Sequence, residues 1–398
     1  MIIELPISKL TVGMYVIDIT YPKDKFRLSS EGWLEHQAII DALKKKGVER
    51  LLVDTSKTKA AETIEPAETK QASPPKNNVN RKPFLAQDII KAKAVFNESK
   101  RIQRKVFDDA KNGVPLDLKP VSHITDESIE LIFSNPDALA CVLNIRKKDE
   151  YLLEHSVAVA ALMTIFACYL KIDKETIRHL AVGAFLHDVG KIMIPEHILN
   201  KPGKLTDSEF VIMKTHANHS ITTIENTPGI HQLSLEVARL HHEKLNGLGY
   251  PFNVSGEHIS KYGRMIAICD IFDALTANRC YKQGYPQVKA FSILRALADN
   301  NELDSQLVNQ FIKCLGVYPV GALVQLESKR LAIVETRNPD DPIRPRVKPF
   351  YHLEPKHFEK GSDIDLASVT DDLIVKCVRA DDFDLDMEQI IDFLAHEG

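Results

Sequence analysis

Histidines and aspartates gather in the middle of this 398-residue chain, where more than half of its 15 histidines lie between residues 155 and 242. Histidine is the commonest nitrogen ligand of transition metals in proteins, and carboxylates complete such sites. A single histidine is more often a surface residue or a hydrogen-bonded core residue, so the residues around each one decide the interpretation. Four local clusters stand out, and together they favour a metal centre.

The first cluster is the sequence Leu-His-Asp-Val-Gly-Lys at residues 186–191, which ends an apolar segment. Neighbouring side chains diverge by about 100° on a helix. His187 and Asp188 can therefore meet one metal only near a helix end, or hold a metal pair from adjacent directions. Lys191 follows His187 by four residues, which predicts a shared helical face from which a lysine can bind a phosphate oxygen. The alternative is a helix end capped by Gly190 and followed by a solvated lysine.

The second and third clusters add imidazoles. His216 is expected on a helix that begins with a capping box at Thr206. His241 and His242 precede a Gly-Leu-Gly-Tyr-Pro stretch, whose glycines predict a sharp loop that presents Tyr250 beside the histidines. Two adjacent imidazoles at a helix end lower helix propensity without adding core volume, so packing alone does not account for them.

The fourth cluster lies on an apolar helix expected over residues 258–281. Asp270 and Asp273 are three residues apart and share a face of that helix. Two carboxylates on such a helix are costly to bury unless they are paired or bind metal. Arg279 and Lys282 continue on related faces and form a cationic edge suited to phosphate or guanine.

These elements, in this order, resemble the HD-GYP family, a subgroup of the HD-domain metal-dependent phosphohydrolases. The similarity covers residues 137–321. It rests on the His-Asp pair, the downstream Lys-Thr-His, the His-His-Glu and Gly-Tyr-Pro signature, and the helix with Asp-x-x-Asp-Ala-Leu-Thr-x-x-Arg. The N-terminal segment resembles a small domain of unknown function that often precedes HD-GYP domains.

The resemblance implies an all-helical catalytic domain that binds two or three metals, usually iron or manganese. Asp188 would bridge two of them with a hydroxide alongside, and Lys191 would contact the scissile phosphate. Tyr250, Arg279 and Lys282 match family positions that hold the substrate. The metal ligands carried over from the family are His155, His187, Asp188, His216, His241, His242 and Asp270.

Two positions depart from the family pattern. Tyr151 stands where some members carry a glutamate that helps to hold a third metal, and a phenol with a pKa near 10 is a poor ligand at neutral pH. We therefore expect two divalent metal ions per chain, iron or manganese. Asn246 stands where the signature usually has aspartate, which keeps the turn propensity but removes a charge near the ligands.

The activity that the resemblance implies is that of a phosphodiesterase, which hydrolyses cyclic di-GMP to linear pGpG by means of a hydroxide activated by two metals. Further cleavage to GMP, and action on cyclic GMP-AMP, are left open. Asn246 and the loss of a third metal leave room for another class, a sensor that binds cyclic di-GMP with little turnover and signals through the N-terminal domain. A hydrolase of mononucleotides or (p)ppGpp is a third alternative, against which the Gly-Tyr-Pro segment argues.

The rest of the sequence predicts a mainly α fold with smaller units at both ends. Residues 1–55 indicate a small α/β domain with a helix over 36–46, and residues 56–84, which almost lack large apolar side chains, predict a disordered linker. Connecting helices are expected over 85–136, the HD-GYP domain over 137–321 and a β-rich extension over 322–398. The expected helices are 91–112, 126–146, 150–171, 173–189, 207–226, 234–243, 258–281, 286–298 and 304–315, and the expected strands are 2–5, 14–19, 48–53, 322–327, 331–336 and 373–378.

The composition limits the possible binding partners and indicates a cellular compartment. A formal net charge of −4 argues against a polymeric nucleic acid as partner. Six cysteines without CxxC spacing, and an N-terminus without the features of a signal peptide, predict a cytoplasmic protein. The most apolar window, 157–170, is shorter than a membrane-spanning helix, so no membrane association is expected. A homo-oligomer and a signalling protein partner both remain open.

Overall fold

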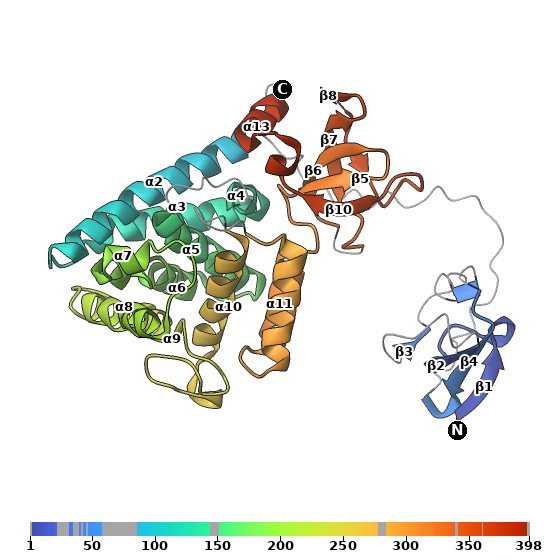
Figure 1. Cartoon of the computed structure of the whole chain (residues 1–398), viewed down its shortest axis with the longest axis horizontal. Coiled ribbons are helices and arrows are strands. Elements are labelled where there is room, and N and C mark those ends of the chain that lie inside the picture. The colour runs from blue at the N-terminus through green and yellow to red at the C-terminus, as the bar shows by residue number, and fades with distance from the viewer. Residues whose placement is uncertain are drawn as a thin grey trace. The chain divides into compact units, whose positions relative to one another are not determined.

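The structure is a computed structural model that describes residues 2–21, 32–34, 40, 43–44, 47–57, 86–143, 151–277, 284–338, 341–359 and 361–395. The chain divides into two compact units, Met1–Val79 and Asn80–Gly398. The first unit is built around strands and the second around helices, as Figure 1 shows for each unit separately.

The first unit contains a four-stranded antiparallel sheet with the order β1-β4-β2-β3. Apolar side chains of its central strands, including Val16, Ile19, Leu51 and Val53, form a small core of their own. The strands expected over 2–5, 14–19 and 48–53 are confirmed, whereas most of the helix expected over 36–46 lies outside the described residues. The strands are β1 (Ile2–Pro6), β2 (Tyr15–Tyr21), β3 (Gly32–Trp33) and β4 (Arg50–Asp54).

The second unit is mainly α-helical, as expected. The one helix expected over 126–146 is two helices, because Asn135 ends the first and Pro136, which suits a first helical turn, begins the second. The helices are α2 (Ala86–Lys111), α3 (Leu118–Ser134), α4 (Pro136–Leu143), α5 (Tyr151–Tyr169), α6 (Lys174–Leu186), α7 (Glu196–Leu199), α8 (Asp207–Glu225), α9 (Gln232–Leu240), α10 (Lys261–Thr276), α11 (Gln287–Asp299), α12 (Ser305–Leu315) and α13 (Met387–Ala395), with a 3-10 helix, η3 (Val189–Met193), after α6.

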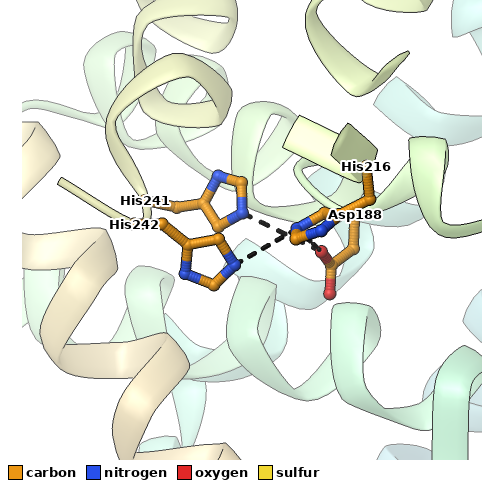
Figure 2. Close-up of side chains that lie close together, drawn as sticks. All are labelled: Asp188, His216, His241 and His242. Carbon is orange, nitrogen blue, oxygen red and sulfur yellow. Dashed lines mark hydrogen bonds and ion pairs between the residues drawn. The ribbon is translucent and has the colours of Figure 1, made fainter. Parts of the chain in front are cut away.

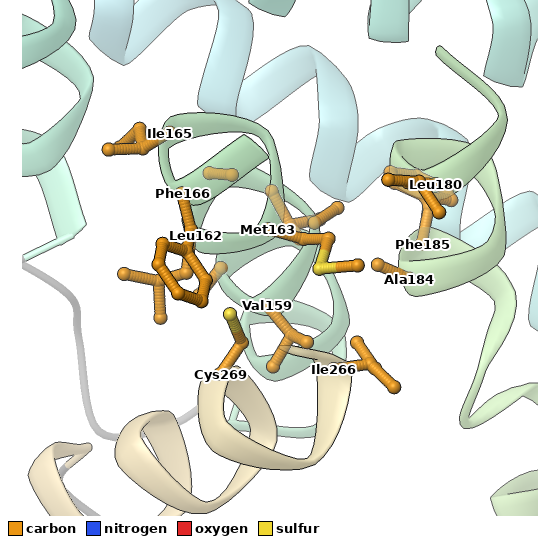
Figure 3. Packing of buried hydrophobic residues seen from close by; sticks show 14 of the residues in the cluster. Val159, Leu162, Met163, Ile165, Phe166, Leu180, Ala184, Phe185, Ile266 and Cys269 are labelled. Atoms are coloured by element: carbon orange, nitrogen blue, oxygen red, sulfur yellow. The ribbon is translucent and has the colours of Figure 1, made fainter. Parts of the chain in front are cut away.

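Helix α5 lies at the centre of this unit, with α6 and α10 packed against it (Figure 3). Val159, Met163 and Phe166 are fully or almost fully buried between these neighbours. The apolar stretch is longer than the sequence window suggested, because Leu152–Tyr169 is long and apolar enough to cross a membrane by length and composition. However, 72% of it is buried inside the protein, which is how the core helix of a helical domain behaves.

An antiparallel sheet follows the helices, with the order β10-β5-β6-β7-β8 and β9 paired to β7. Both faces of the sheet are covered. Leu331 and Ile333 of β6 pack on the side of α13, while Ala332 and Val334 pack on the other side with Leu366. The strands are β5 (Leu323–Leu326), β6 (Arg330–Thr336), β7 (Arg346–Leu353), β8 (Lys356–Phe358), β9 (Ile364–Asp365) and β10 (Ile374–Val378), of which β7, β8 and β9 were not expected from the sequence.

Candidate metal centre

All seven side chains predicted as metal ligands lie together in the core of the helical unit. They come from five parts of the chain: His155 from α5, His187 and Asp188 from the end of α6, His216 from α8, His241 and His242 from the end of α9, and Asp270 from α10. Figure 2 shows how Asp188, His216, His241 and His242 face one another.

Asp188 is the common element of this cluster, and its side chain is fully buried. Its Oδ2 lies 3.3 Å from Nε2 of His155 and 3.2 Å from Nε2 of His187. Its Oδ1 lies 3.3 Å from Nε2 of His216 and 3.9 Å from Nε2 of His241. Each carboxylate oxygen therefore faces its own pair of imidazole nitrogens, which gives two neighbouring positions that share one aspartate.

Asp270 closes the cluster on the side of α10. One of its oxygens lies 3.0 Å from Nε2 of His155, and the other lies 3.4 Å from Nδ1 of His242. His242 in turn has its Nε2 3.1 Å from Nε2 of His216. Asp270 thus links the two halves of the cluster, as a second shared carboxylate would.

Backbone carbonyls fix the orientation of three of the imidazoles. In His187, His216 and His241, Nδ1 lies within hydrogen-bond distance of the carbonyl oxygen three residues earlier, at 2.6, 2.7 and 2.7 Å. An Nδ1–H that donates to this carbonyl leaves the lone pair on Nε2, the nitrogen that faces Asp188. The ring of His155 is held differently, because its Nδ1 lies 2.7 Å from Oδ2 of Asp273.

Several buried atoms of the cluster have no hydrogen-bond partner among the described residues. These atoms are Nε2 of His187, Oδ1 of Asp188 and Nε2 of His241. Buried polar atoms without partners are rare in folded proteins and are costly. Here the lone pairs of imidazole nitrogens and carboxylate oxygens face one another. A divalent cation between them would accept electron pairs from both kinds of ligand, so the arrangement fits a metal site.

The protonation states also suit a metal centre. Burial, opposed in part by nearby carboxylates, lowers the pKa of His241 to about 3, and burial likewise holds the pKa of His242 well below its usual value. Burial works to raise the pKa of Asp188, but Lys191 and His187 lower it more, so this pKa lies well below the ordinary range. Neutral imidazoles and ionised carboxylates are the forms that bind metal.

Lys191 reaches the cluster through a turn that the sequence did not predict. The expectation that it shares a helical face with His187 is wrong, because α6 ends at Leu186 and Lys191 lies on the 3-10 helix that follows. From there its Nζ contacts Oδ2 of Asp188, and only 16% of the side chain is exposed. It is therefore not the solvated lysine of the alternative interpretation.

Gly190 lets this turn pack directly on α8. A Cβ at residue 190 would lie 2.2 Å from the carbonyl oxygen of His216 and 2.3 Å from the backbone nitrogen of Ser220. The backbone N–H of Gly190 also donates to Oγ of Ser220 at 2.8 Å. The close approach brings His216 next to the His-Asp pair, so Gly190 helps to position the metal centre. It is not the cap of the helix that was expected, because α6 already ends at Leu186.

The Gly-Tyr-Pro loop folds back onto the paired histidines. The N–H of Tyr250 donates to the carbonyl oxygen of His242 at 3.2 Å, and the two rings lie 4.5 Å apart between centroids. A Cβ at Gly249 would lie 2.5 Å from Cα of Glu243. The carboxylate of Glu243 accepts the N–H of Phe252 at 2.7 Å, so this buried residue holds the loop in place.

Glu243 and Asp273 are two contributing residues that the sequence interpretation did not assign. Asp273 holds the ring of His155, and Glu243 holds the loop that carries Tyr250. Both offered a signal in the sequence, because Glu243 directly follows His242 and Asp273 follows Asp270 by three residues. The departure at Asn246 is accommodated, because its Oδ1 accepts the N–H of Leu248 at 3.0 Å and so forms the turn that an aspartate would form.

Three predicted features lie outside what the structure describes. Residues 278–283 include Arg279 and Lys282, and the side chain of Tyr151 is also not described. Their roles stay predictions. His179, His219 and His231 are not among the predicted ligands, and they do not belong to either metal-binding group found among the described residues.

Comparison with known proteins agrees with this centre. The HD domain family matches residues 141–307, and the domain of unknown function DUF3391 matches residues 2–121. The chain is similar to Cyclic di-GMP phosphodiesterase PA4108 of Pseudomonas aeruginosa, with 33% identity over 89% of this chain and 87% of that protein. It is also similar to 3'3'-cGAMP-specific phosphodiesterase 1 of Vibrio cholerae (35% identity, 42% of this chain, 38% of that protein). A cyclic di-GMP phosphodiesterase of Thermotoga maritima is 32% identical over 53% of this chain and 59% of that protein.

The fold and the site define a metal-dependent hydrolase of the HD-domain superfamily. The extent of the similarity to PA4108 places the chain in a narrower group: it belongs to the HD-GYP family of phosphodiesterases, with a DUF3391 domain at its N-terminal end.

Proposed function

We propose that this chain hydrolyses cyclic di-GMP to linear pGpG, with GMP as the product of a second cleavage. The observation that carries the proposal is the arrangement around Asp188, whose two oxygens each face a separate pair of imidazole nitrogens. Such an arrangement fits the hydrolysis of a phosphodiester. The choice of substrate is supported by the similarity to PA4108, which covers 89% of this chain.

The metal-binding residues we propose fall into two groups that share Asp188. One contains His155 and His187, and the other contains His216, His241 and His242, while Asp270 lies between them. Imidazole and carboxylate ligands without a thiolate suit iron or manganese. Two such ions, when bound, lower the pKa of a water molecule and neutralise phosphate oxygens.

The residues of the chain itself supply positioning and charge. Lys191 places an ammonium group beside Asp188 in a largely buried setting, where a fixed positive charge stabilises a phosphate that gains negative charge. Tyr250 forms a wall of the site next to His242. Arg279 and Lys282 are proposed to complete the substrate site.

Cyclic GMP-AMP is the second candidate substrate, because 3'3'-cGAMP-specific phosphodiesterase 1 is 35% identical over 42% of this chain. A cytoplasmic location is also part of the proposal. Cys168, Cys269, Cys314 and Cys377, the cysteines whose side chains the structure describes, have free thiols, which suits a reducing compartment.

The proposed division of the chain places residues 1–55 in the N-terminal domain, 56–84 in the linker and 137–321 in the catalytic domain. Helix α2 supports a boundary before residue 85, since its Phe96 and Val106 belong to the hydrophobic core of the helical unit. A protein that begins at Leu85 is expected to bind metal and retain phosphodiesterase activity. If it folds but is wholly inactive, the N-terminal domain contributes to the site.

A substrate panel tests the proposed function. The full-length protein, reconstituted anaerobically with Fe(II) or Mn(II), is incubated with cyclic di-GMP, cyclic GMP-AMP, cyclic di-AMP and a mononucleotide, and the products are separated by chromatography. We expect pGpG to appear first and fastest. Binding of cyclic di-GMP without any product would support the sensor alternative and contradict the proposal.

A further inference from the structure

Phe210 and Tyr250 form an aromatic corner beside the metal centre, and Phe210 has no role in the function described so far. Phe210 is on α8, and 48% of it is exposed. Its ring stands almost perpendicular to the ring of Tyr250, with an interplanar angle of 85° and 6.4 Å between centroids. A flat molecule stacked on one of these rings would present its edge to the other.

Lys214 adds a positive charge to this corner. It lies one helical turn after Phe210, with its Nζ 5.4 Å from the centroid of Phe210 and 6.0 Å from that of Tyr250. No carboxylate of the described residues lies within ion-pair distance of it, whereas Lys201 and Lys244 each contact a glutamate at 2.6 Å. A half-buried ammonium group held by two rings is thus available to an acceptor from a ligand.

The corner adjoins the atoms that are proposed to bind metal. The ring of Tyr250 lies 4.5 Å from that of His242 and 6.2 Å from that of His216. His216 is also only two residues after Lys214 on the same helix. A substrate whose phosphate is held at the metal centre would therefore carry its attached nucleoside past Tyr250.

We propose that Phe210, Tyr250 and Lys214 form a subsite for one guanine base of the substrate, an inference that rests on the proposed function. The base would stack on Phe210 with its edge toward Tyr250, because base–aromatic stacking contributes to binding for every base. Lys214 would donate to O6 or N7, the two acceptors on the edge of guanine. Adenine has an amino group in place of O6, so Lys214 would favour guanine.

Substitution of Phe210 tests the stacking. Phe210→Ala is expected to raise KM for cyclic di-GMP by about 5- to 100-fold, the range that loss of one base stack gives. Phe210→Trp is expected to restore it. Val211→Ala is the matched control, because Val211 is the next residue on α8 and is 60% exposed. Metal content should stay at the wild-type level in all three variants, and Val211→Ala should also keep the wild-type KM.

Substitution of Lys214 tests the recognition of the base edge. Lys214→Met is expected to lower the preference for cyclic di-GMP over cyclic di-AMP by about tenfold, as the loss of a specific base contact does, while Lys214→Arg keeps it. If Phe210→Ala and Lys214→Met leave KM and this preference unchanged in a protein that cleaves cyclic di-GMP, the subsite does not exist. If the wild-type protein cleaves bis(p-nitrophenyl) phosphate but no cyclic dinucleotide, the proposed function itself is wrong.

Discussion

Histidine rings lie against one another in three places within the described part of the chain, and only one of these places is suited to bind metal. In the metal centre, the rings of His187, His216 and His241 surround Asp188 and are buried. In two surface pairs the rings are stacked instead. His179 and His231 lie 3.7 Å apart at 8°, and His352 and His357 lie 5.6 Å apart at 11°.

The difference between the metal centre and the surface pairs lies in what holds the rings. The three rings of the centre are each held at Nδ1 by a carbonyl three residues earlier, so that every Nε2 faces one carboxylate. Among the described residues, no carboxylate lies within ion-pair distance of His179, His231, His352 or His357. Proximity of histidines is therefore not enough: a shared carboxylate and a fixed tautomer are what define this centre.

Removal of the shared carboxylate should have the largest effect. Asp188→Asn is expected to lose most of the bound metal and to lower turnover of cyclic di-GMP by about a thousandfold. Metal ions supply several kcal/mol of transition-state stabilisation, and each 1.4 kcal/mol or so is a factor of ten in rate. Elemental analysis and steady-state kinetics measure both effects. Full metal content in this variant would show that Asp188 does not join the two positions.

Substitution of Lys191 should distinguish stabilisation of the negative charge on the phosphate from binding of the metals. Lys191→Met is expected to lower kcat by about 10²- to 10³-fold, the effect of losing one fixed donor at a developing negative charge, while metal content stays unchanged. Lys289→Met, at an exposed position on α11, is the control and should behave as wild type. Wild-type turnover in the Lys191 variant would show that Lys191 does not stabilise the developing negative charge.

Asp273 tests how much the orientation of one ligand matters. Asp273→Asn keeps the size of the side chain but weakens its bond to Nδ1 of His155, so metal affinity or activity should fall by about 10- to 100-fold. Asp299→Asn, an exposed carboxylate at the end of α11, provides the control. If the two variants have the same metal affinity and activity, the contact between Asp273 and His155 does not contribute to metal binding.

Acid should destabilise the metal-free protein through the buried imidazoles. The pKa of His241 is about 3 in the folded chain, mainly because of burial, and near 6.5 in the unfolded chain. Between these values the unfolded chain binds more protons, so the free energy of unfolding falls as pH drops from 6.5 toward 3, by about 1.4 kcal/mol per pH unit for this group. Urea titrations of metal-stripped protein at pH 5 and 6.5 measure this change, and His241→Gln should flatten it. A pH-independent free energy of unfolding would contradict the burial of a neutral ring.

The surface pair in the C-terminal sheet should show the smallest effect. The double variant His352→Ala, His357→Ala removes two stacked rings at the turn between β7 and β8, and surface changes of this kind alter the free energy of unfolding by about 0.5 kcal/mol or less. Turnover and metal content should match wild type. A loss of bound metal in this variant would place part of the metal outside the centre.

The sequence alone was sufficient to predict that these seven residues form one cluster, because the residue types and their order carry the resemblance to HD-GYP proteins. It did not predict the backbone conformation that brings them together. Asp188 lies in the turn between α6 and η3, where its backbone has left the helix, and this turn is what brings Lys191 onto Asp188. A helical projection of residues 186–191 cannot show such a change.

Tertiary contacts explain the other differences. Strand β7 contains Pro349, and a proline inside an apolar run argues against a central strand. The strand is possible because its pairing with β6 is irregular next to this proline, which the sequence does not show. Phe210 looks like any surface residue of α8 in the sequence, since its position against Tyr250 depends on how the loop after α9 folds back. Sequence patterns predict elements and ligands, whereas contacts between distant loops need coordinates.

The most direct test of the central claim is to locate the metals. Crystals of the Mn(II)- or Fe(II)-reconstituted wild-type protein are measured at the absorption edge of the metal, and anomalous difference maps are calculated. The account predicts two peaks on either side of the Asp188 carboxylate, one near His155 and His187 and the other near His216 and His241. A centre without peaks, or peaks confined to the surface pairs of histidines, would contradict it.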